Sequence, residues 1–184
     1  VGLGYVGLPL AVALGRHFKV LGFDISSTRI EQLQNGLDVT KEVDAEDLRT
    51  TKIDYTDNPE RLAEAGVIVV AVPTPIDQNR KPDLEPVVSA TQTIGTHLSP
   101  GTIVVYESTV YPGLTEEICL PILEQQSGLG CGHDFSLGYS PERINPGDRV
   151  HTLESIVKVV AGLDLATTSF LEQFYGTIVE AGIH

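Results

Sequence analysis

Three glycines near the beginning of the sequence have a spacing that can bring the backbone against phosphate groups. Gly2, Gly4 and Gly7 form the pattern G-x-G-x-x-G. In a turn of this kind the first glycine makes the tight bend, the second leaves room for a pyrophosphate, and the third lets helix and strand pack closely. The N–H groups at the start of the next helix then face the anion. The pattern predicts a dinucleotide site, with Tyr5 and Val6 of the same turn as further candidate contacts.

An acidic residue follows this turn at the distance that a dinucleotide site requires. Asp24 ends the apolar segment 19–24, which we expect to be a strand. A carboxylate there accepts hydrogen bonds from the adenosine ribose and repels a 2′-phosphate, so it favours NAD over NADP. Asp24 could instead cap the next helix, although the hydroxyl residues at 26–28 could do so equally well. Arg29, in that helix, is another candidate cofactor contact.

Two polar turns follow apolar segments farther along, one after the β-branched run 67–72 and one after 102–106. A run without alternation indicates a strand buried on both faces, in the middle of a parallel sheet. Ligands of such sheets lie at the carboxyl ends of the strands. The first turn, at 73–75, could also be only a rigid turn. The candidate cofactor contacts in the two turns are Pro73, Thr74, Glu107, Ser108 and Thr109.

Strand and helix patterns alternate along the whole sequence. Apolar spacing predicts helices over 8–17, 26–36, 59–65, 84–98 and 164–175, and one that starts at 112 and is disturbed at Pro121. Short apolar runs predict strands over 19–24, 52–56, 67–72, 102–106, 135–139, 155–161 and 177–179. The acidic segment 37–50 is expected to be irregular and to lie over the sheet edge. The alternation predicts one α/β domain with a doubly wound parallel sheet, a Rossmann-like fold.

The composition argues against several classes of partner. The 184 residues include 25 acidic and 12 basic ones, which gives a net charge of −13. Nucleic acid and membrane surfaces are therefore not expected as partners, because both favour basic patches. The five histidines lack metal-ligand spacing, so no metal is expected. Cys119 and Cys131 form no disulfide framework, which suits a reducing, cytoplasmic compartment.

Four ordered motifs give the sequence a resemblance to a known family. They are GLGYVGLP at 2–9, VAVPTP at 70–75, ESTVYPG at 107–113 and YSPERINPGD at 139–148. With these motifs the sequence resembles the nucleotide-sugar 6-dehydrogenases, the UDP-glucose and GDP-mannose dehydrogenase family. The form of the last motif is most similar to the branch that oxidises UDP-N-acetyl-hexosamines. The resemblance covers 1–184 and is to the N-terminal NAD-binding domain of that family.

The resemblance implies that the C6 alcohol of a UDP-N-acetyl-hexosamine is oxidised to a carboxylate, for the synthesis of surface polysaccharide precursors. This four-electron reaction would reduce two molecules of NAD. The aldehyde would be held as a thiohemiacetal on a cysteine, and the second hydride transfer would leave a thioester that water cleaves. That cysteine, its substrate domain and a helix with a catalytic lysine would lie beyond His184. The intact protein is expected to be a homo-oligomer.

The resemblance also assigns roles to two residues. Thr109, in the S-T-V motif, would position the water and contact the nicotinamide side. Glu142, in the P-E motif, would be the acid and base for thioester hydrolysis. Glu142 could instead pair with Arg143 or cap a helix. Several UDP-glucose dehydrogenases carry a second glutamate where this sequence has Pro146, which makes glucose a less favoured sugar.

Other interpretations stay open at this point. The substrate could be UDP-glucose or GDP-mannose, and a non-catalytic NAD-binding module would keep the fold without the chemistry. A β-hydroxyacid dehydrogenase shares the glycine turn, but the motifs at 107–113 and 139–148 do not belong to its usual pattern. The downstream sequence would separate these classes, because only the enzyme needs the lysine and the cysteine.

The glycine pattern requires a strand before it, and only Val1 precedes Gly2. The sequence also contains no methionine. We therefore expect residues 1–184 to be a fragment whose first strand is truncated. Since loss of a central strand loosens the support of the glycine turn, this fragment alone is expected to bind NAD weakly and to be inactive.

Overall fold

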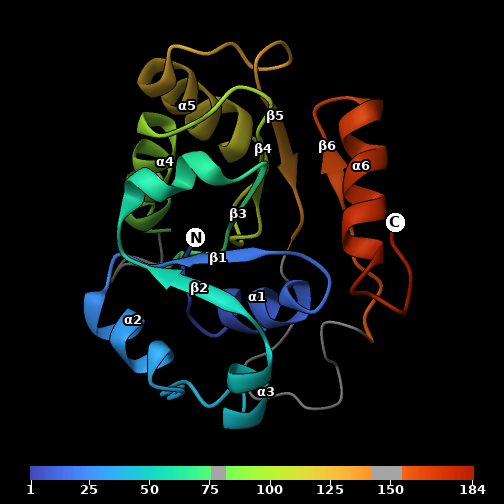
Figure 1. The fold of residues 1–184 in the computed structure, drawn as a ribbon. Helices are drawn as coiled ribbons and strands as arrows, with labels where there is room; N and C mark the ends of the chain where they lie inside the picture. Colours follow the sequence, from blue (N-terminus) through green and yellow to red (C-terminus); the bar gives the residue numbers. More distant parts are fainter. Residues whose placement is uncertain (76–81, 142–154) are drawn as a thin grey trace.

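Two sheets form the centre of the chain in the computed structural model, which describes residues 1–75, 82–141 and 155–184 (Figure 1). The smaller sheet pairs β1 (Val20–Phe23) with β2 (Ile53–Thr56) in parallel. The larger sheet has the order β3 (Val67–Val70), β4 (Ile103–Tyr106), β5 (Ser136–Tyr139) and β6 (Ala161–Gly162). Its first three strands are parallel and β6 is antiparallel to β5. The expectation of one continuous parallel sheet is therefore wrong among the described residues, although the doubly wound character is confirmed.

Helices cover both faces of the larger sheet. The described helices are, in chain order, α1 (Gly7–Gly15), α2 (Ser27–Gln34), α3 (Ala45–Thr50), the 3₁₀ helix η1 (Pro59–Glu64), α4 (Glu85–Thr96), the π-helix η2 (Thr115–Cys119), α5 (Leu120–Ser127) and α6 (Leu165–Gly176). Of these, α2 and α3 pack beside the smaller sheet. The helices α4 and α5 lie on one side of β3–β5, and α6 lies on the other side (Figure 1). This three-layer arrangement is the Rossmann-like fold that the alternating pattern predicts.

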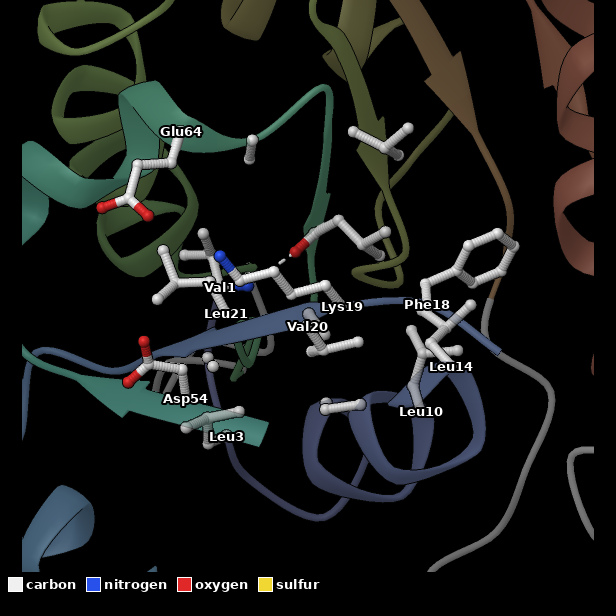
Figure 2. A pocket seen from close by; sticks show the side chains of 18 of the residues that line it. Val1, Leu3, Leu10, Leu14, Phe18, Lys19, Val20, Leu21, Asp54 and Glu64 are labelled. Atoms are coloured by element: carbon white, nitrogen blue, oxygen red, sulfur yellow. Dashed lines mark hydrogen bonds between the residues drawn. The ribbon is translucent and has the colours of Figure 1, made fainter. Parts of the chain in front are cut away.

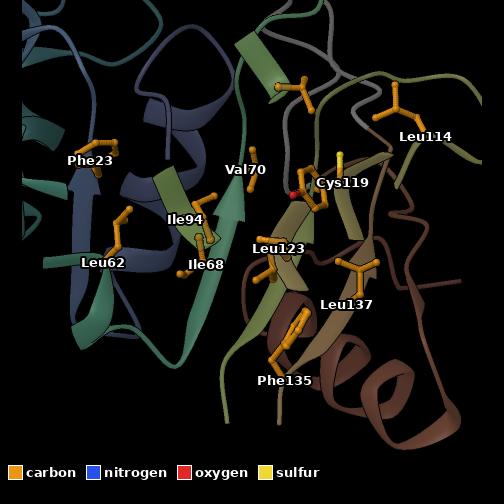
Figure 3. Packing of buried hydrophobic residues seen from close by; sticks show 13 residues of the cluster. Phe23, Leu62, Ile68, Val70, Ile94, Leu114, Cys119, Leu123, Phe135 and Leu137 are labelled. Atoms are coloured by element: carbon orange, nitrogen blue, oxygen red, sulfur yellow. The ribbon is translucent and has the colours of Figure 1, made fainter. Parts of the chain in front are cut away.

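Strand β4 shows how alternation places side chains on both faces. Val104 and Tyr106 belong to the cluster against α4 and α5. Figure 3 shows this cluster, with Ile94 of α4 and Leu123 of α5 among its labelled residues. Val105, between them, points into the cluster formed with α1 and α6. The Tyr106 hydroxyl lies 2.8 Å from the hydroxyl of Thr91 on α4, so its polar end is satisfied inside the core. The apolar run 102–106 is thus a strand buried on both faces, as predicted.

Strand β3 departs from the same expectation. Ile68 and Val70 are buried in the α4/α5 cluster, but Val67 and Val69 are only half-buried. The latter two line a cavity between the two sheets. The prediction of a strand from the β-branched run is therefore confirmed. The prediction that this strand is buried on both faces holds for only one face.

The sequence predicts that the segment 37–50 is irregular, but only its first part is. Its last part forms α3, whose N-cap Asp44 accepts hydrogen bonds from the amides of Glu46 and Asp47. Acidic residues in the first turn suit the positive end of the helix dipole. Leu48 is the buried residue of α3 and packs with α1 and α2. The polar composition conceals a short helix that has one apolar anchor.

Two predicted strands near the carboxyl end are wrong. The run 155–161 contributes only its last residue to β6, together with an isolated parallel bridge between Lys158 and Ile183. Residues 177–179 form no strand. Ile178 and Val179 are instead buried beside α6, where the chain turns after the helix. Their apolar character reflects burial in a turn and not strand pairing.

The predicted disturbance at Pro121 takes a specific form. A π-helical turn, η2, directly precedes α5, and Pro121 lies in the first turn of α5. Proline has no N–H and its ring crowds the carbonyl four residues earlier, so a widened turn relieves both problems. None of the helices in the described parts of the chain is long and apolar enough to cross a bilayer.

Candidate cofactor site

The three glycines of the turn are required for different reasons. A Cβ on Gly7 would lie 1.8 Å from the carbonyl oxygen of Gly2. Gly2 has a φ of +84°, and its Cβ would lie 2.9 Å from the carbonyl oxygen of Ala71. A Cβ on Gly4 would meet no described atom within 4 Å. The fold itself thus needs Gly2 and Gly7, whereas Gly4 faces open space, as the predicted approach of a pyrophosphate would require.

Asp24 lies at this turn. Its Oδ2 accepts a hydrogen bond from the amide of Leu3 at 2.8 Å, and its Oδ1 accepts one from the amide of Ser26 at 2.9 Å. The N-cap of α2 is Ser26, whose side chain accepts from the amide of Arg29. Capping of α2 by Asp24, the alternative considered for this residue, is therefore not observed. Asp24 is placed where the end of β1 meets the glycine turn, as a ribose-binding carboxylate requires.

Arg29, on α2, contacts the same turn. Its Nε donates to the carbonyl oxygen of Leu3 at 2.8 Å, and its Nη2 pairs with Oδ1 of Asp38 at 2.8 Å. Only 10% of the Arg29 side chain and 1% of the Asp38 side chain are exposed. Arg29 thus contacts the turn through a backbone carbonyl of the turn, that of Leu3. Sequence reasoning missed Asp38, since an acidic residue in an acidic segment gives no signal of burial.

The remaining residues of the turn lie at its surface. Tyr5 is 48% exposed. Val6 directly precedes α1 and provides no side-chain cap for it. At the start of α1 the amides of Leu8 and Leu10 already donate to the carbonyl oxygens of Gly4 and Val6, and Pro9 has no N–H. Contact with an anion at this helix end would therefore fall to the amides of the turn before Leu8.

The two polar turns at the strand ends lie side by side. The hydroxyl of Thr74 donates to the carbonyl oxygen of Thr109 at 2.6 Å, and the hydroxyl of Ser108 donates to the carbonyl oxygen of Val72 at 2.7 Å. Pro73 and Thr109 are exposed, whereas Ser108 is buried. The structure therefore joins these turns into one rim and leaves Thr109 accessible on it.

Glu107 has a different environment from its neighbours. It is 1% exposed, and its Oε2 accepts from Nζ of Lys158 at 3.2 Å. The same Nζ lies 5.0 Å above the ring centre of Tyr175 on α6. Glu107 is thus placed beneath the rim, paired with a buried cation, and not at the surface. Lys158 was missed, although a lysine inside the apolar run 155–161 is a signal for a buried partner.

The third strand end is described only in part. The amide of Ser140 donates to the carbonyl oxygen of Tyr106, and its hydroxyl donates to the carbonyl oxygen of Val159. The end of β5 therefore lies beside the end of β4. Glu142, Arg143 and Pro146 lie outside the described residues, so the role of Glu142 stays a prediction.

Neither cysteine is activated. Cys119 is buried, and burial raises the pKa of its thiol. Burial also raises the pKa of Cys131. A nucleophilic thiol needs a lowered pKa, so neither environment favours a nucleophile. Within the described ranges, His, Cys, Asp and Glu form no group of three that could hold a metal ion.

A cavity of about 440 Å³ separates the two sheets. Figure 2 shows Leu10 and Leu14 of α1 and Val20 of β1 among the residues around it. The first residues of the chain cross this cavity at the carboxyl ends of β1 and β3. There the Val1 nitrogen donates to the carbonyl oxygen of Val69, and the Val1 carbonyl oxygen accepts from the amide of Ala71. The amide of Gly2 then donates to the carbonyl oxygen of Phe23 on β1. Residues 1 and 2 thus join β3 to β1.

Comparison with known proteins agrees with this geometry. Residues 1–179 match the model of the UDP-glucose/GDP-mannose dehydrogenase family, NAD binding domain. Protein CapL of Staphylococcus aureus is 56% identical over the whole chain, and the UDP-N-acetyl-D-glucosamine 6-dehydrogenase of Pseudomonas aeruginosa is 51% identical. The chain spans 43% and 44% of their lengths, respectively.

A solved structure shows the same fold. The NDP-N-acetyl-D-galactosaminuronic acid dehydrogenase from Methanosarcina mazei superposes with a TM-score of 0.90 at 31% identity, over 99% of this chain and 42% of that one. The glycine turn, the open space at Gly4 and the carboxylate of Asp24 fit the cofactor that the family model names. The chain belongs to the UDP-glucose/GDP-mannose dehydrogenase family and corresponds to its NAD-binding domain.

Proposed function

We propose that this chain is the cofactor domain of an NAD-dependent UDP-N-acetyl-hexosamine 6-dehydrogenase that supplies precursors of a surface polysaccharide. The observation that carries the proposal is the identity of 51% and 47% to two enzymes named UDP-N-acetyl-D-glucosamine 6-dehydrogenase, over the full chain. The site geometry supports it, because the glycine turn and the accessible Thr109 are held in one domain. NAD, when bound, provides the hydride acceptor.

The chain's own residues would divide the work between two ends of the site. The amides of the glycine turn before Leu8 would hold the pyrophosphate, and Asp24 would accept hydrogen bonds from the ribose. Thr109 would orient the hydrolytic water at the nicotinamide end. Glu142 would take and return the proton during thioester hydrolysis. The cysteine that forms the thioester is proposed to lie in the part of the enzyme that follows this domain.

A substrate panel tests the proposal. The intact protein is incubated with NAD and, in turn, UDP-N-acetylglucosamine, UDP-N-acetylgalactosamine, UDP-glucose and GDP-mannose, and absorbance of NADH is followed. We expect one of the two UDP-N-acetyl-hexosamines to be oxidised fastest, with two NADH formed per sugar. Preference for UDP-glucose or GDP-mannose would move the assignment to another branch. No NADH with any sugar, despite NAD binding, would favour the non-catalytic module.

The role of Glu142 has its own test. Glu142→Gln in the intact enzyme is expected to slow thioester cleavage about 10²- to 10⁴-fold, the usual value of general acid–base catalysis. The first hydride transfer should change far less, so a covalent sugar adduct should accumulate. Intact-protein mass spectrometry measures that adduct. Near-normal turnover without an adduct would rule out the role.

We also propose that the enzyme is cytoplasmic and homo-oligomeric and that its partner is the UDP-sugar. The net charge of −13 disfavours nucleic acid and anionic membrane surfaces. Size-exclusion chromatography with light scattering on the intact protein measures the oligomeric state. A monomer at micromolar concentration would contradict the second part.

We further propose that the strand that the glycine turn requires lies in the cavity between β1 and β3. The bonds of Val1 to β3 and of Gly2 to β1 already set a parallel register for such a strand. The half-buried Val67 and Val69 would then become buried, as a central strand of β-branched residues requires. Burial lowers the pKa of the Val1 amino group to about 6, whereas a peptide N–H would make the same bond without a charge to desolvate.

Three forms of the protein test this arrangement. A form carrying five aliphatic β-branched residues before Val1 is compared with residues 1–184 and with a control extended by Gly and Ser. The aliphatic form should melt at higher temperature and protect the amides of 20–23 and 67–70 from hydrogen exchange. Equal protection in all three forms would contradict the proposal.

Residues 1–184 alone should give no NADH with either UDP-N-acetyl-hexosamine, and sustained NADH production would show that Cys119 or Cys131 is a working nucleophile.

A further inference from the structure

Residues 107–109, which lead from β4 to the rim, are each held to β3 or to the turn after it by one hydrogen bond. These bonds run from the Glu107 amide to the Val70 carbonyl, from the Ser108 hydroxyl to the Val72 carbonyl and from the Thr74 hydroxyl to the Thr109 carbonyl, at 2.8, 2.7 and 2.6 Å, respectively. All three lie on the β3 side of β4. They therefore fix the rim relative to β3 and not relative to the layer that contains α6.

A buried ion pair connects the same residues to that layer. Nζ of Lys158 donates to Oε2 of Glu107 at 3.2 Å, and 6% of the Lys158 side chain and 0% of the Glu107 side chain are exposed. The same Nζ lies 5.0 Å from the ring centre of Tyr175 on α6, within the range in which an ammonium group is attracted to a ring face. The side chain of Glu107 thus links the chain before Thr109 to α6.

The backbone of Lys158 is itself fixed on both sides. Its amide donates to the carbonyl oxygen of Gly182 at 3.1 Å, and its carbonyl oxygen accepts from the amide of His184 at 2.8 Å. The next carbonyl oxygen, that of Val159, accepts from the hydroxyl of Ser140 at the end of β5 at 2.9 Å. A lysine that starts from a fixed backbone and ends between a carboxylate and a ring can hold that carboxylate in one place.

Stability alone gives little reason for an ion pair at this position. Taking two charges out of water is costly, and an apolar pair of similar volume often stabilises a core equally well or better. An ion pair differs from an apolar contact in being directional, because an N–H of the ammonium group must point at a carboxylate oxygen. Glu107 is two residues from Thr109, which is exposed on the rim. What the pair adds at this place is a fixed position for the end of β4.

We infer that Lys158 is a positioning residue of the proposed dehydrogenase: through Glu107 it fixes the end of β4 from the α6 side, so that Thr109 is held where it orients the hydrolytic water. The inference rests on the proposed function and on the role of Thr109 in it. Lys158 and Glu107 are buried beneath the rim, so neither needs to touch the substrate or the cofactor. Their effect is expected in the second half of the reaction, the hydrolysis of the thioester.

The test uses variants of the intact protein that separate position from stability. Lys158→Met leaves the Glu107 carboxylate without this cation and should lower the melting temperature. Lys158→Met combined with Glu107→Leu replaces the ion pair by an apolar contact, so it should recover most of the stability but not the direction. Ile94→Ala is the matched control, because it removes buried volume from the α4/α5 cluster and lowers the melting temperature without touching the pair.

Four quantities are measured for each variant. They are the melting temperature, kcat and KM for the UDP-N-acetyl-hexosamine that is oxidised fastest, the covalent sugar adduct by mass spectrometry, and the order parameter of the Thr109 methyl group. The order parameter is obtained by NMR without ligand, so it reports on the rim independently of activity.

We expect the double variant to melt near the unchanged protein but to lose about 10- to 100-fold in kcat, since a displacement of about 1 Å can cost 10²-fold. Its KM should stay within about twofold, because the lost interaction acts after the sugar has bound. The sugar adduct should accumulate, and the order parameter of Thr109 should fall. Ile94→Ala should melt at lower temperature and keep kcat, KM and the order parameter.

Two results would overturn the inference. One is a double variant that regains both stability and kcat, which would make the pair purely structural. The other is an unchanged order parameter of Thr109 in the double variant. Should the double variant stay less stable, an equal loss of kcat in Ile94→Ala at a matched melting temperature would also overturn it. If the unchanged protein oxidises no nucleotide sugar, the proposed function fails instead, and the order parameter still decides whether Lys158 positions the rim.

Discussion

The glycine turn and the rim that carries Thr109 are held in place over different sequence distances. The hydrogen bonds that fix Leu3 come from residues 21 and 26 positions away. At the end of β4, the contacts of Thr109, Ser108 and Glu107 span 35, 36 and 51 positions. The first region is a β–turn–α–β unit that can organise itself from neighbouring residues. The second exists only when three strand ends and the chain after β5 have come together.

This difference separates two kinds of sensitivity. In the glycine turn, backbone sterics dominate, since Cβ atoms have no room at Gly2 and Gly7. At the rim, the balance of a buried charge dominates, since Glu107 and Lys158 are both nearly inaccessible. We therefore expect substitutions in the turn to destabilise the fold through steric clashes. Substitutions at the rim should destabilise it by leaving a buried charge without its partner.

The largest effect is expected within the turn. Gly7→Ala places a Cβ 1.8 Å from the Gly2 carbonyl oxygen and should destabilise the domain by more than about 5 kcal/mol. Gly4→Ala meets no described atom within 4 Å, so it should leave stability within about 0.5 kcal/mol while weakening NAD binding. Urea denaturation and calorimetry measure the two quantities. A folded Gly7→Ala protein of normal stability would contradict the steric account.

The next effect tests the rim. Lys158→Met leaves the Glu107 carboxylate without its buried cation and should lower the free energy of unfolding by about 3–5 kcal/mol. Adding Glu107→Leu should recover most of this loss, because an uncharged pair costs no desolvation. Arg16→Met, in an exposed ion pair with Asp47, is the control and should cost less than about 1 kcal/mol. Equal losses in the two single variants would show that burial of the Glu107 pair has no special weight.

A smaller effect concerns cofactor choice. Asp24→Ala removes both the expected ribose acceptor and the partner of the Leu3 amide, so NAD affinity should fall about tenfold, or ~1.4 kcal/mol. The preference for NAD over NADP should narrow, because the negative charge that repels a 2′-phosphate is gone. Steady-state kinetics of the intact enzyme with both cofactors measure this. If the unchanged enzyme uses NADP as well as NAD, the assignment of Asp24 is wrong.

The smallest effect is a dependence of stability on pH. Burial raises the pKa of Asp38, but the hydrogen bonds from Thr40, Val43 and Arg29 outweigh it and hold the pKa below the ordinary value of 3.8. The ionised form thus stabilises the fold above this value, and that stabilisation is lost as the pH falls through the lowered pKa. Urea midpoints between pH 2.5 and 6 should fall less steeply for Asp38→Asn than for the unchanged protein. Parallel curves would contradict the contribution of Asp38.

What could be predicted from the sequence follows the same division. The spacing of the glycines and Asp24 predicts their meeting, because a single β–α–β unit fixes the geometry. The sequence also predicts that the turns at 73–75 and 107–109 share a sheet edge. It does not reveal the Glu107–Lys158 pair, since the residues around each of them in the sequence give no sign of the other. Asp38 escaped notice for a related reason, because its burial depends on Arg29 and on the shape of the loop after α2.

The errors at the carboxyl end have a physical cause as well. Apolar runs at 155–161 and 177–179 satisfy the pattern of buried strands, but burial against α6 satisfies the same side chains without pairing. Helix α3 was missed because one apolar residue, Leu48, gives no periodicity. Its Asp44 cap was the available signal.

Strand β6 has a consequence for the behaviour of the folded domain at high concentration. It is two residues long and runs antiparallel along β5. An exposed strand edge is a template on which another chain can add by backbone pairing, and long flat edges lead to aggregation. At this end of the larger sheet, such an incoming strand would find only Ala161 and Gly162 in regular strand geometry. The short strand therefore limits edge-to-edge growth of the sheet at this end.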